Sequence, residues 1–268
     1  MEDLPKGLAA SNAGKIAQKL GMISASRVLD VGTDKGGFID TLIKTLQAYD
    51  SFIGIDYCPS DKSKQDMESA KKRFDGKAVQ FLRMNAENLG FEDESFDTVG
   101  ISYSLHHLAN IDSVMTEVKR VLKNGGNLIL QEMYCDGEQT EAQNTDRLAH
   151  EWEARIDSLL GVTHNKTLTR QQIRDVANGL NLKEMEIIDS THPVDCLFCE
   201  RKYQCEDPRD QATFHQITKD IDDGIKRIEN YPDLRVRIRL MEEGERIKEA
   251  VTESGAAPAS YLFIIGKK

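Results

Sequence analysis

Acidic side chains gather around one glycine-rich segment, VLDVGTDKGGF, whose composition suggests a ligand site. Asp30 lies two residues before Gly32, and Asp34 stands where the dinucleotide fingerprint GxGxxG has its middle glycine. A helix that begins after such a turn directs its positive, amide-rich end at whatever binds there. Because carboxylates repel a pyrophosphate, this turn favours a cationic or hydroxyl-bearing ligand.

Polar residues also follow the next two predicted strands. Asp56 closes the segment 51–56, where a carboxylate can accept hydrogen bonds from both ribose hydroxyls of an adenosine. Asn85 and Ala86 follow the segment 79–84, where an amide side chain and backbone groups can contact an adenine edge. Each residue alone also fits a solvated loop acid or a turn-forming Asn. Their recurrence at successive strand ends predicts a nucleoside site.

Apolar runs and helical spacing alternate along the first half of the chain. The runs predict strands at 27–31, 51–56, 79–84, 98–103, 127–133, 183–189 and 261–266. Helical spacing predicts helices at 38–46, 68–74, 111–122, 138–160 and 170–180. This alternation predicts an α/β fold with a mostly parallel sheet covered on both faces. Residues 234–240, LRVRIRL, alternate like a strand but lie among helix formers, so we expect a helix.

The composition excludes several classes of protein. With 35 basic and 45 acidic residues, the net charge of −10 argues against nucleic acid or anionic lipid as a partner. Hydrophobic residues at 39% and charged residues at 30% are typical of a globular chain. We find no leader and no apolar run long enough to span a membrane. The five cysteines are an odd number, which favours reduced thiols and a cytoplasmic location.

Several ordered motifs together resemble the class I S-adenosylmethionine-dependent methyltransferases. They are VLDVGTDKGGF, FIGIDY, NAENLGFEDESFDTVGISYSLHHL and EVKRVLKNGGNLILQEM, with a weaker likeness at YLFIIGKK. The likeness is greatest to the ubiquinone/menaquinone-biosynthesis-like branch of small-molecule methyltransferases. It implies a Rossmann-like seven-stranded sheet with an antiparallel last strand, and methyl transfer to a small-molecule acceptor with release of S-adenosylhomocysteine.

The resemblance also implies which residues bind the cofactor. By position, Asp30 and Gly32 shape the methionine pocket, Asp56 holds the ribose, and Asn85 with Ala86 flanks the adenine. The full expected set is Asp30, Gly32, Thr33, Asp34, Gly36, Asp56, Tyr57, Asn85, Ala86 and Ser102. The family usually has a glycine where this chain has Asp34 and an acid where it has Asn85.

A sulfonium methyl group is already activated, so such an enzyme mainly aligns donor and acceptor and excludes water. No catalytic base is therefore obligatory. Ser102 and Tyr103 are expected to border the methyl-donating sulfur. Candidates for orienting or deprotonating the acceptor are Tyr103, His106, His107 and, in the loop GVTHNKTLT, His164. The structural alternative is that His106 and His107 cap or pack the next helix.

The predicted elements divide the chain into a core and two insertions. We expect a cofactor-binding core at 1–135 with further core strands at 183–189 and 258–268. Helical insertions at 136–182 and 190–257 are expected to form a lid that selects the acceptor. Trp152 and a series of isoleucines in these insertions fit either an apolar pocket or helix packing.

Three cysteines in the second insertion have a spacing that suits a metal. Cys196, Cys199 and Cys205 form C-x2-C-x5-C, and Cys135 is a candidate fourth ligand for zinc or an iron–sulfur cluster. Reduced thiols, or a disulfide between Cys196 and Cys199, are the alternatives. The motif keeps a second function open, a non-catalytic metal-binding or sensor protein on a methyltransferase fold. The acceptor atom and the oligomeric state also stay open.

Overall fold

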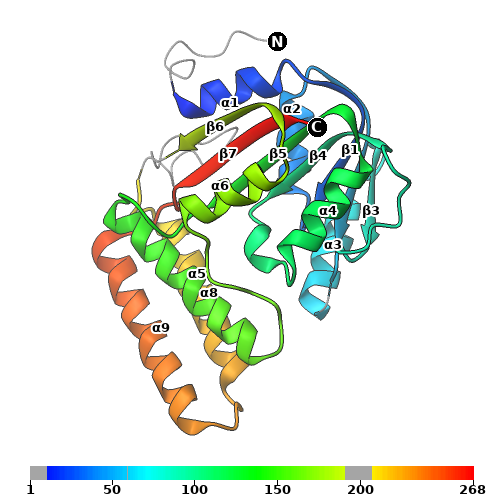
Figure 1. The fold of residues 1–268 in the computed structure, drawn as a ribbon. Coiled ribbons are helices and arrows are strands. Elements are labelled where there is room, and N and C mark those ends of the chain that lie inside the picture. Colours follow the sequence, from blue (N-terminus) through cyan, green and yellow to red (C-terminus); the bar gives the residue numbers. More distant parts are fainter. Residues whose placement is uncertain (1–10, 59, 191–206) are drawn as a thin grey trace. The chain divides into compact units, whose positions relative to one another are not determined.

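The computed structural model describes residues 11–58, 60–190 and 207–268. These residues fall into two compact units (Figure 1). The sheet unit lies within residues 1–132, 171–190 and 261–268, and the helical unit within residues 133–170 and 191–260. Among the described residues, no helix is long and apolar enough to cross a membrane. Cys196, Cys199 and Cys205 lie outside the described residues, so the structure does not test the predicted metal motif.

The sheet unit has the predicted α/β architecture. Its strands are β1 Ser24–Val31, β2 Ala48–Asp56, β3 Val79–Arg83, β4 Phe96–Ser102, β5 Leu122–Met133, β6 Lys183–Ser190 and β7 Tyr261–Lys267. Its helices are α1 Asn12–Leu20, α2 Gly37–Thr45, α3 Asp61–Arg73, the short η2 Leu105–His107, α4 Ile111–Val121 and α6 Arg170–Gly179. The strand order is β3-β2-β1-β4-β5-β7-β6, and β7 pairs antiparallel with β6. The seven-stranded sheet with a reversed last strand is therefore confirmed.

The strand order of the sheet reverses at one point, between β1 and β4. The chain runs from β1 outward through β2 to β3, and then returns to β4, which pairs parallel with β1 on its other side. In open α/β sheets, ligands bind outside the carboxyl ends of the strands at such a reversal, which here is the end of β1 and β4. Both strands are buried along most of their length, which anchors the residues that follow them.

One helix was missed by the sequence prediction, and several element boundaries differ from it. The helix α1 was not predicted; Ser11 caps it by accepting a hydrogen bond from the Gly14 N–H. The helix α3 begins at Asp61 rather than residue 68, because Ser60 and Ser63 form a reciprocal capping box. The strand β5 begins at Leu122, before the Asn-Gly-Gly turn at 124–126 from which it was expected to start.

The helical unit contains α5 Glu141–Leu159, α8 Gln211–Ile228 and α9 Leu234–Ser254. The expected helix over 234–240 is confirmed as the first part of α9, although its sequence alternates like a strand. Asp233 caps it through the Arg235 and Val236 N–H groups, and Leu240, Gly244 and Ile247 are buried at helical spacing. Tertiary burial therefore overrides the local alternation.

Trp152 on α5 fills the centre of the helical unit. It is 1% exposed, and its indole N–H donates to the Leu240 carbonyl over 2.8 Å. Glycines provide the room: a Cβ at Gly224 on α8 would lie 2.6 Å from the indole, and one at Gly244 on α9 would lie 3.0 Å from it. Of the two interpretations of the tryptophan and isoleucine series, helix packing is correct for Trp152, Ile221 and Ile228.

Changing Gly224 to Ala is expected to lower the free energy of unfolding of the helical unit by about 1–3 kcal/mol, because the new methyl group displaces the indole. Trp152 is the single tryptophan of the sequence, so urea unfolding followed by its fluorescence reports on this core alone. The control is Gly179→Ala, whose added Cβ meets nothing within 4 Å. A Gly224→Ala protein as stable as this control would contradict the packing account.

Candidate active site

The turn between β1 and α2 is shaped by left-handed residues and by contacts with β2. Gly32 and Gly36 have φ angles of 73° and 77°, which favour glycine. Asp34 also lies in the left-handed region, with φ 43°, a conformation that Asp tolerates better than most residues. The Gly32 and Thr33 N–H groups both donate to the Ile55 carbonyl, at 2.9 and 3.0 Å. Asp34 therefore fits the position where the family that the motifs resemble usually has a glycine, and the turn keeps its hydrogen bonds to β2.

Asp30 is the most unusual group of this turn. It is 1% exposed, and neither carboxylate oxygen has a hydrogen-bond partner among the described residues. Burial raises the pKa of Asp30 to about 7; the Thr33 hydroxyl opposes this rise and the Asp56 carboxylate adds to it. A buried carboxylate without partners is costly unless a ligand supplies hydrogen bonds or positive charge. Asp30 thus fits the ammonium-bearing part of a ligand.

Asp56 ends β2 beside this turn. Its two carboxylate oxygens accept hydrogen bonds from the Asp34 N–H at 3.1 Å and the Cys58 N–H at 3.2 Å. These bonds fix the carboxylate and leave each oxygen a further lone pair. The neighbouring Tyr57 is 59% exposed. Partial burial, with the Asp66 and Asp56 carboxylates adding and Lys35 opposing, raises the pKa of Asp34. The structure therefore places Asp56, the residue predicted to bind the ribose, next to Asp34 of the turn.

Asn85 lies in the exposed turn after β3, followed by the half-buried Ala86. Its amide oxygen accepts a hydrogen bond from the Glu87 N–H at 2.9 Å, which is an Asx turn. The structural interpretation of Asn85 is thus correct for its oxygen, and its NH2 group remains as a donor. A carboxylate here would make the same turn and keep a second acceptor oxygen for an adenine amino group.

Changing Asn85 to Asp is therefore expected to tighten the binding of S-adenosylhomocysteine by about 3–10-fold, because a charged acceptor replaces a neutral amide. Calorimetric titration measures the change. Asn88→Asp in the same turn adds an equal charge and serves as the control. Equal effects of the two variants would show that overall charge, rather than adenine recognition, is responsible.

The end of β4 carries Ser102 and Tyr103 to the same edge as Gly32. Tyr103 has a left-handed φ of 49°, and its phenol oxygen accepts a hydrogen bond from the Gln131 side chain at 2.8 Å. The Ser104 hydroxyl donates to the Ser102 carbonyl at 2.8 Å and to the Gly32 carbonyl at 3.2 Å. Sequence reasoning missed Ser104 and Gln131; a polar Gln131 within the apolar strand LILQEM was the available signal for one of them.

His106 and His107 lie on the short helix η2 but have different surroundings. His106 is 1% exposed, and its Nδ1 lies 2.9 Å from the carboxylate of Glu132, which is fully buried. Glu132 also accepts the Leu105 N–H at 2.7 Å, so it fixes the start of η2. His107 is exposed. The packing alternative thus describes the contact of His106 with Glu132, a residue that the sequence analysis did not single out.

Two further predicted residues belong to the helical unit. His164 is 5% exposed and contacts Asp157 and His150. Cys135 is half-buried, and its N–H donates to the Leu168 carbonyl. Burial, together with the Asp136 and Glu151 carboxylates, raises the pKa of the Cys135 thiol, so this thiol is a weak nucleophile.

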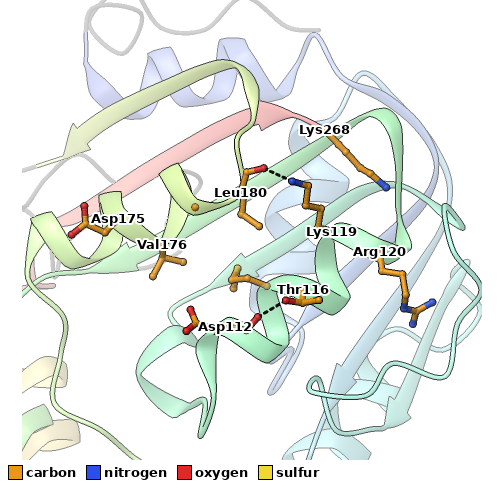
Figure 2. A pocket seen from close by; sticks show the side chains of 10 residues that line it. Asp112, Thr116, Lys119, Arg120, Asp175, Val176, Leu180 and Lys268 are labelled. Carbon is orange, nitrogen blue, oxygen red and sulfur yellow. Dashed lines mark hydrogen bonds between the residues drawn. The ribbon is translucent and has the colours of Figure 1, made fainter.

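A cavity of about 450 Å³ lies between α4 and α6 and contains none of the predicted site residues (Figure 2). Its basic groups are already engaged. Lys119 donates to the Leu180 carbonyl at 2.9 Å, and Arg120 binds the Glu117 and Asp93 carboxylates.

Comparison with known proteins agrees with the fold and the motifs. Residues 29–130 match the family model described as methyltransferase domain. Phthiotriol/phenolphthiotriol dimycocerosates methyltransferase 1 of Mycobacterium ulcerans is 28% identical over 180 residues, covering 67% of this chain and 60% of that protein. A ubiquinone/menaquinone biosynthesis C-methyltransferase, UbiE of Geobacter sp. (strain M21), is 30% identical over 115 residues, covering 43% and 48%. The chain thus spans about half to three fifths of the length of these relatives.

Residues 29–130 therefore match a methyltransferase domain, and the expected likeness to small-molecule class I methyltransferases is confirmed. The crystal structure of YcgJ from Bacillus subtilis is 18% identical with a TM-score of 0.51, covering 96% of this chain and 97% of that one. Phosphoethanolamine N-methyltransferase 2 of Haemonchus contortus, solved with S-adenosyl-L-methionine, is 16% identical with a TM-score of 0.52, covering 96% and 52%. At these identities the structural likeness establishes the fold alone.

Proposed function

We propose that this protein is an S-adenosylmethionine-dependent methyltransferase that methylates a small-molecule acceptor and releases S-adenosylhomocysteine. The single observation that carries the proposal is the buried Asp30 carboxylate without a hydrogen-bond partner among the described residues, beside the reversal of strand order. An ammonium group would supply the missing charge and hydrogen bonds. The family match and the relatives named above support the same activity.

The residues of the sheet unit fit the parts of this cofactor. Ionised Asp30 would accept hydrogen bonds from the methionine ammonium group, and Asp56 would hold the ribose hydroxyls. Thr33, Asp34 and Gly36 would surround the ligand through the turn. When bound, the cofactor supplies a methyl group on a sulfonium, which needs no further activation. Ser102 and Tyr103, at the end of β4, would border that group and exclude water.

Acceptor choice belongs, in this proposal, to the helical insertions at 136–182 and 190–257. The names of the relatives mention ubiquinone/menaquinone biosynthesis and phthiotriol dimycocerosates, so apolar quinol-like compounds are the first acceptors to test. No catalytic base is required by the mechanism, and Tyr103 with His106, His107 and His164 remain candidates for orienting the acceptor. The odd number of cysteines favours a cytoplasmic location.

Changing Asp56 to Ala is expected to weaken S-adenosylhomocysteine binding by about 10–100-fold, because charge-assisted hydrogen bonds to the ribose are lost. Titration calorimetry measures the affinity, and S-adenosylhomocysteine release with a panel of quinols, phenols and thiols measures transfer. Asp93→Asn, at a carboxylate that is 76% exposed, is the control. Equal affinity of wild type and Asp56→Ala would overturn the proposed cofactor site.

A further inference from the structure

A mostly buried polar cluster in the helical unit contains none of the expected cofactor-binding residues. His164 lies in the loop after α5, and its Nδ1 is 2.7 Å from an Asp157 carboxylate oxygen. Its Nε2 lies 3.2 Å from the Nε2 of His150, which is half-buried on α5. The other Asp157 oxygen binds the Arg227 guanidinium from α8. The two imidazole rings thus face each other with their Nε2 atoms, and the Asp157 carboxylate holds the ring of His164.

The charges around Asp157 fix the proton of His164. The Asp157 carboxylate lies between the His164 imidazole and the Arg227 guanidinium, with one oxygen facing each of them. Because a carboxylate only accepts hydrogen bonds, the His164 Nδ1–H donates to Asp157, and the imidazole form of His164 then has its lone pair on Nε2, facing His150. Asp157 therefore orients His164 so that its Nε2 can bind a ligand on the side of His150.

The distance between the two Nε2 atoms suits a shared metal ion. Two nitrogens bound to one tetrahedral zinc at 2.0–2.1 Å are about 3.3 Å apart, close to the 3.2 Å observed. Ligating histidines usually donate their other ring N–H to a carboxylate, as His164 does to Asp157. We propose that His150 and His164 are ligands of a divalent transition-metal ion of the zinc class, with Asp157 as the residue that orients His164.

The surrounding backbone holds this arrangement in place. His150 and Asp157 lie seven residues apart on α5, which places them on one face of the helix. The Ser158 hydroxyl donates to the His164 carbonyl at 3.0 Å, and the Val162 N–H donates to the Asp157 carbonyl at 2.9 Å. Metal binding requires the ring proton of His150 to lie on Nδ1, so that the Nε2 lone pairs of both histidines can face the ion. Water, or an oxygen or sulfur atom of a bound small molecule, would occupy the coordination positions of the metal ion that the two histidines leave open.

The test is zinc titration of the full chain after treatment with EDTA, in a background with Cys196, Cys199 and Cys205 changed to Ser. This background removes competing thiolates. We expect one equivalent of zinc to bind, with binding removed by His150→Gln and by His164→Gln. Asp157→Asn should weaken it by about 10–100-fold. His215→Gln is the matched control, because His215 is exposed on α8 and its Nδ1 contacts the Gln211 carbonyl of its own helix.

Two results would overturn the proposal: no zinc binding at about 100 µM in this background, or binding that survives both histidine changes. Thermal unfolding of each variant in EDTA shows whether a variant fails to bind zinc because it lacks a ligand or because it does not fold. If His164→Gln does not fold, the test uses the His150→Gln variant alone, since His150 is only half-buried. The absorption spectrum of bound Co²⁺ then reports whether nitrogen or thiolate ligands hold the ion.

Discussion

Changing Asp30 to Asn is expected to weaken S-adenosylhomocysteine binding by about 100-fold and yet to stabilise the unliganded protein at alkaline pH. The loss of affinity follows because a charged, buried hydrogen-bond acceptor is replaced by a neutral amide. The gain in stability follows from the pKa of Asp30, which burial raises from 3.8 to about 7. Between these values the unfolded chain has released the proton and the folded chain has kept it. Asp30 therefore lowers the stability of wild type as pH rises, until about pH 7.

Urea unfolding at pH 5 and pH 8 measures this effect. The Asp30→Asn protein should gain about 3 kcal/mol relative to wild type between the two values, because the variant lacks the titration. Wild-type affinity for S-adenosylhomocysteine should fall as pH drops below 7, whereas the variant's affinity should not. Asp93→Asn, at an exposed carboxylate, is the control for general charge effects. A variant that parallels wild type at both pH values would show that Asp30 is not a buried, titrating ligand group.

Changing Gly32 to Ala is expected to remove cofactor binding and to lower the free energy of unfolding by about 2–4 kcal/mol. Two costs add: a left-handed φ of 73° strains any residue with a side chain, and the new Cβ would lie 2.3 Å from the Ser104 hydroxyl. Ser104→Gly in the same protein relieves the second cost only. The double variant should therefore recover about half of the lost stability.

The matched control for this variant is Gly37→Ala, five residues further on at the start of α2. A Cβ at Gly37 meets nothing within 4 Å, and its φ is not in the left-handed region, so the change should be neutral or slightly stabilising. Urea unfolding and calorimetry of the four proteins complete the comparison. If Gly32→Ala is as stable as Gly37→Ala, the contact with Ser104 does not constrain the turn.

The sequence predicted the sheet and its turn because these features depend on local patterns. Apolar runs identified the buried strands, and glycine with Asp34 identified a turn that needs left-handed residues. Contacts between distant segments could not be read in this way. Such contacts form only when strands or loops distant in sequence come together, and a residue type alone does not identify its partner. Examples are Ser104 with Gly32, Gln131 with Tyr103, and Glu132 with His106.

Helix boundaries and the helical unit show the same limit. Periodicity located α5, but the role of Trp152 depends on Gly224 and Gly244 from two other helices. The pairing of His164 with His150 also needed the fold, because fourteen residues and a loop separate them in sequence. The predicted cofactor residues, the lid assignment and the cysteine motif stay predictions.

The central claim is that the turn after β1 binds the methyl donor, and titration of the full-length protein with S-adenosylhomocysteine tests it most directly. We expect one molecule bound per chain, affinity that declines below pH 7, and no displacement by NAD. Absence of heat at high micromolar concentration, or tight NAD binding in its place, would contradict the account.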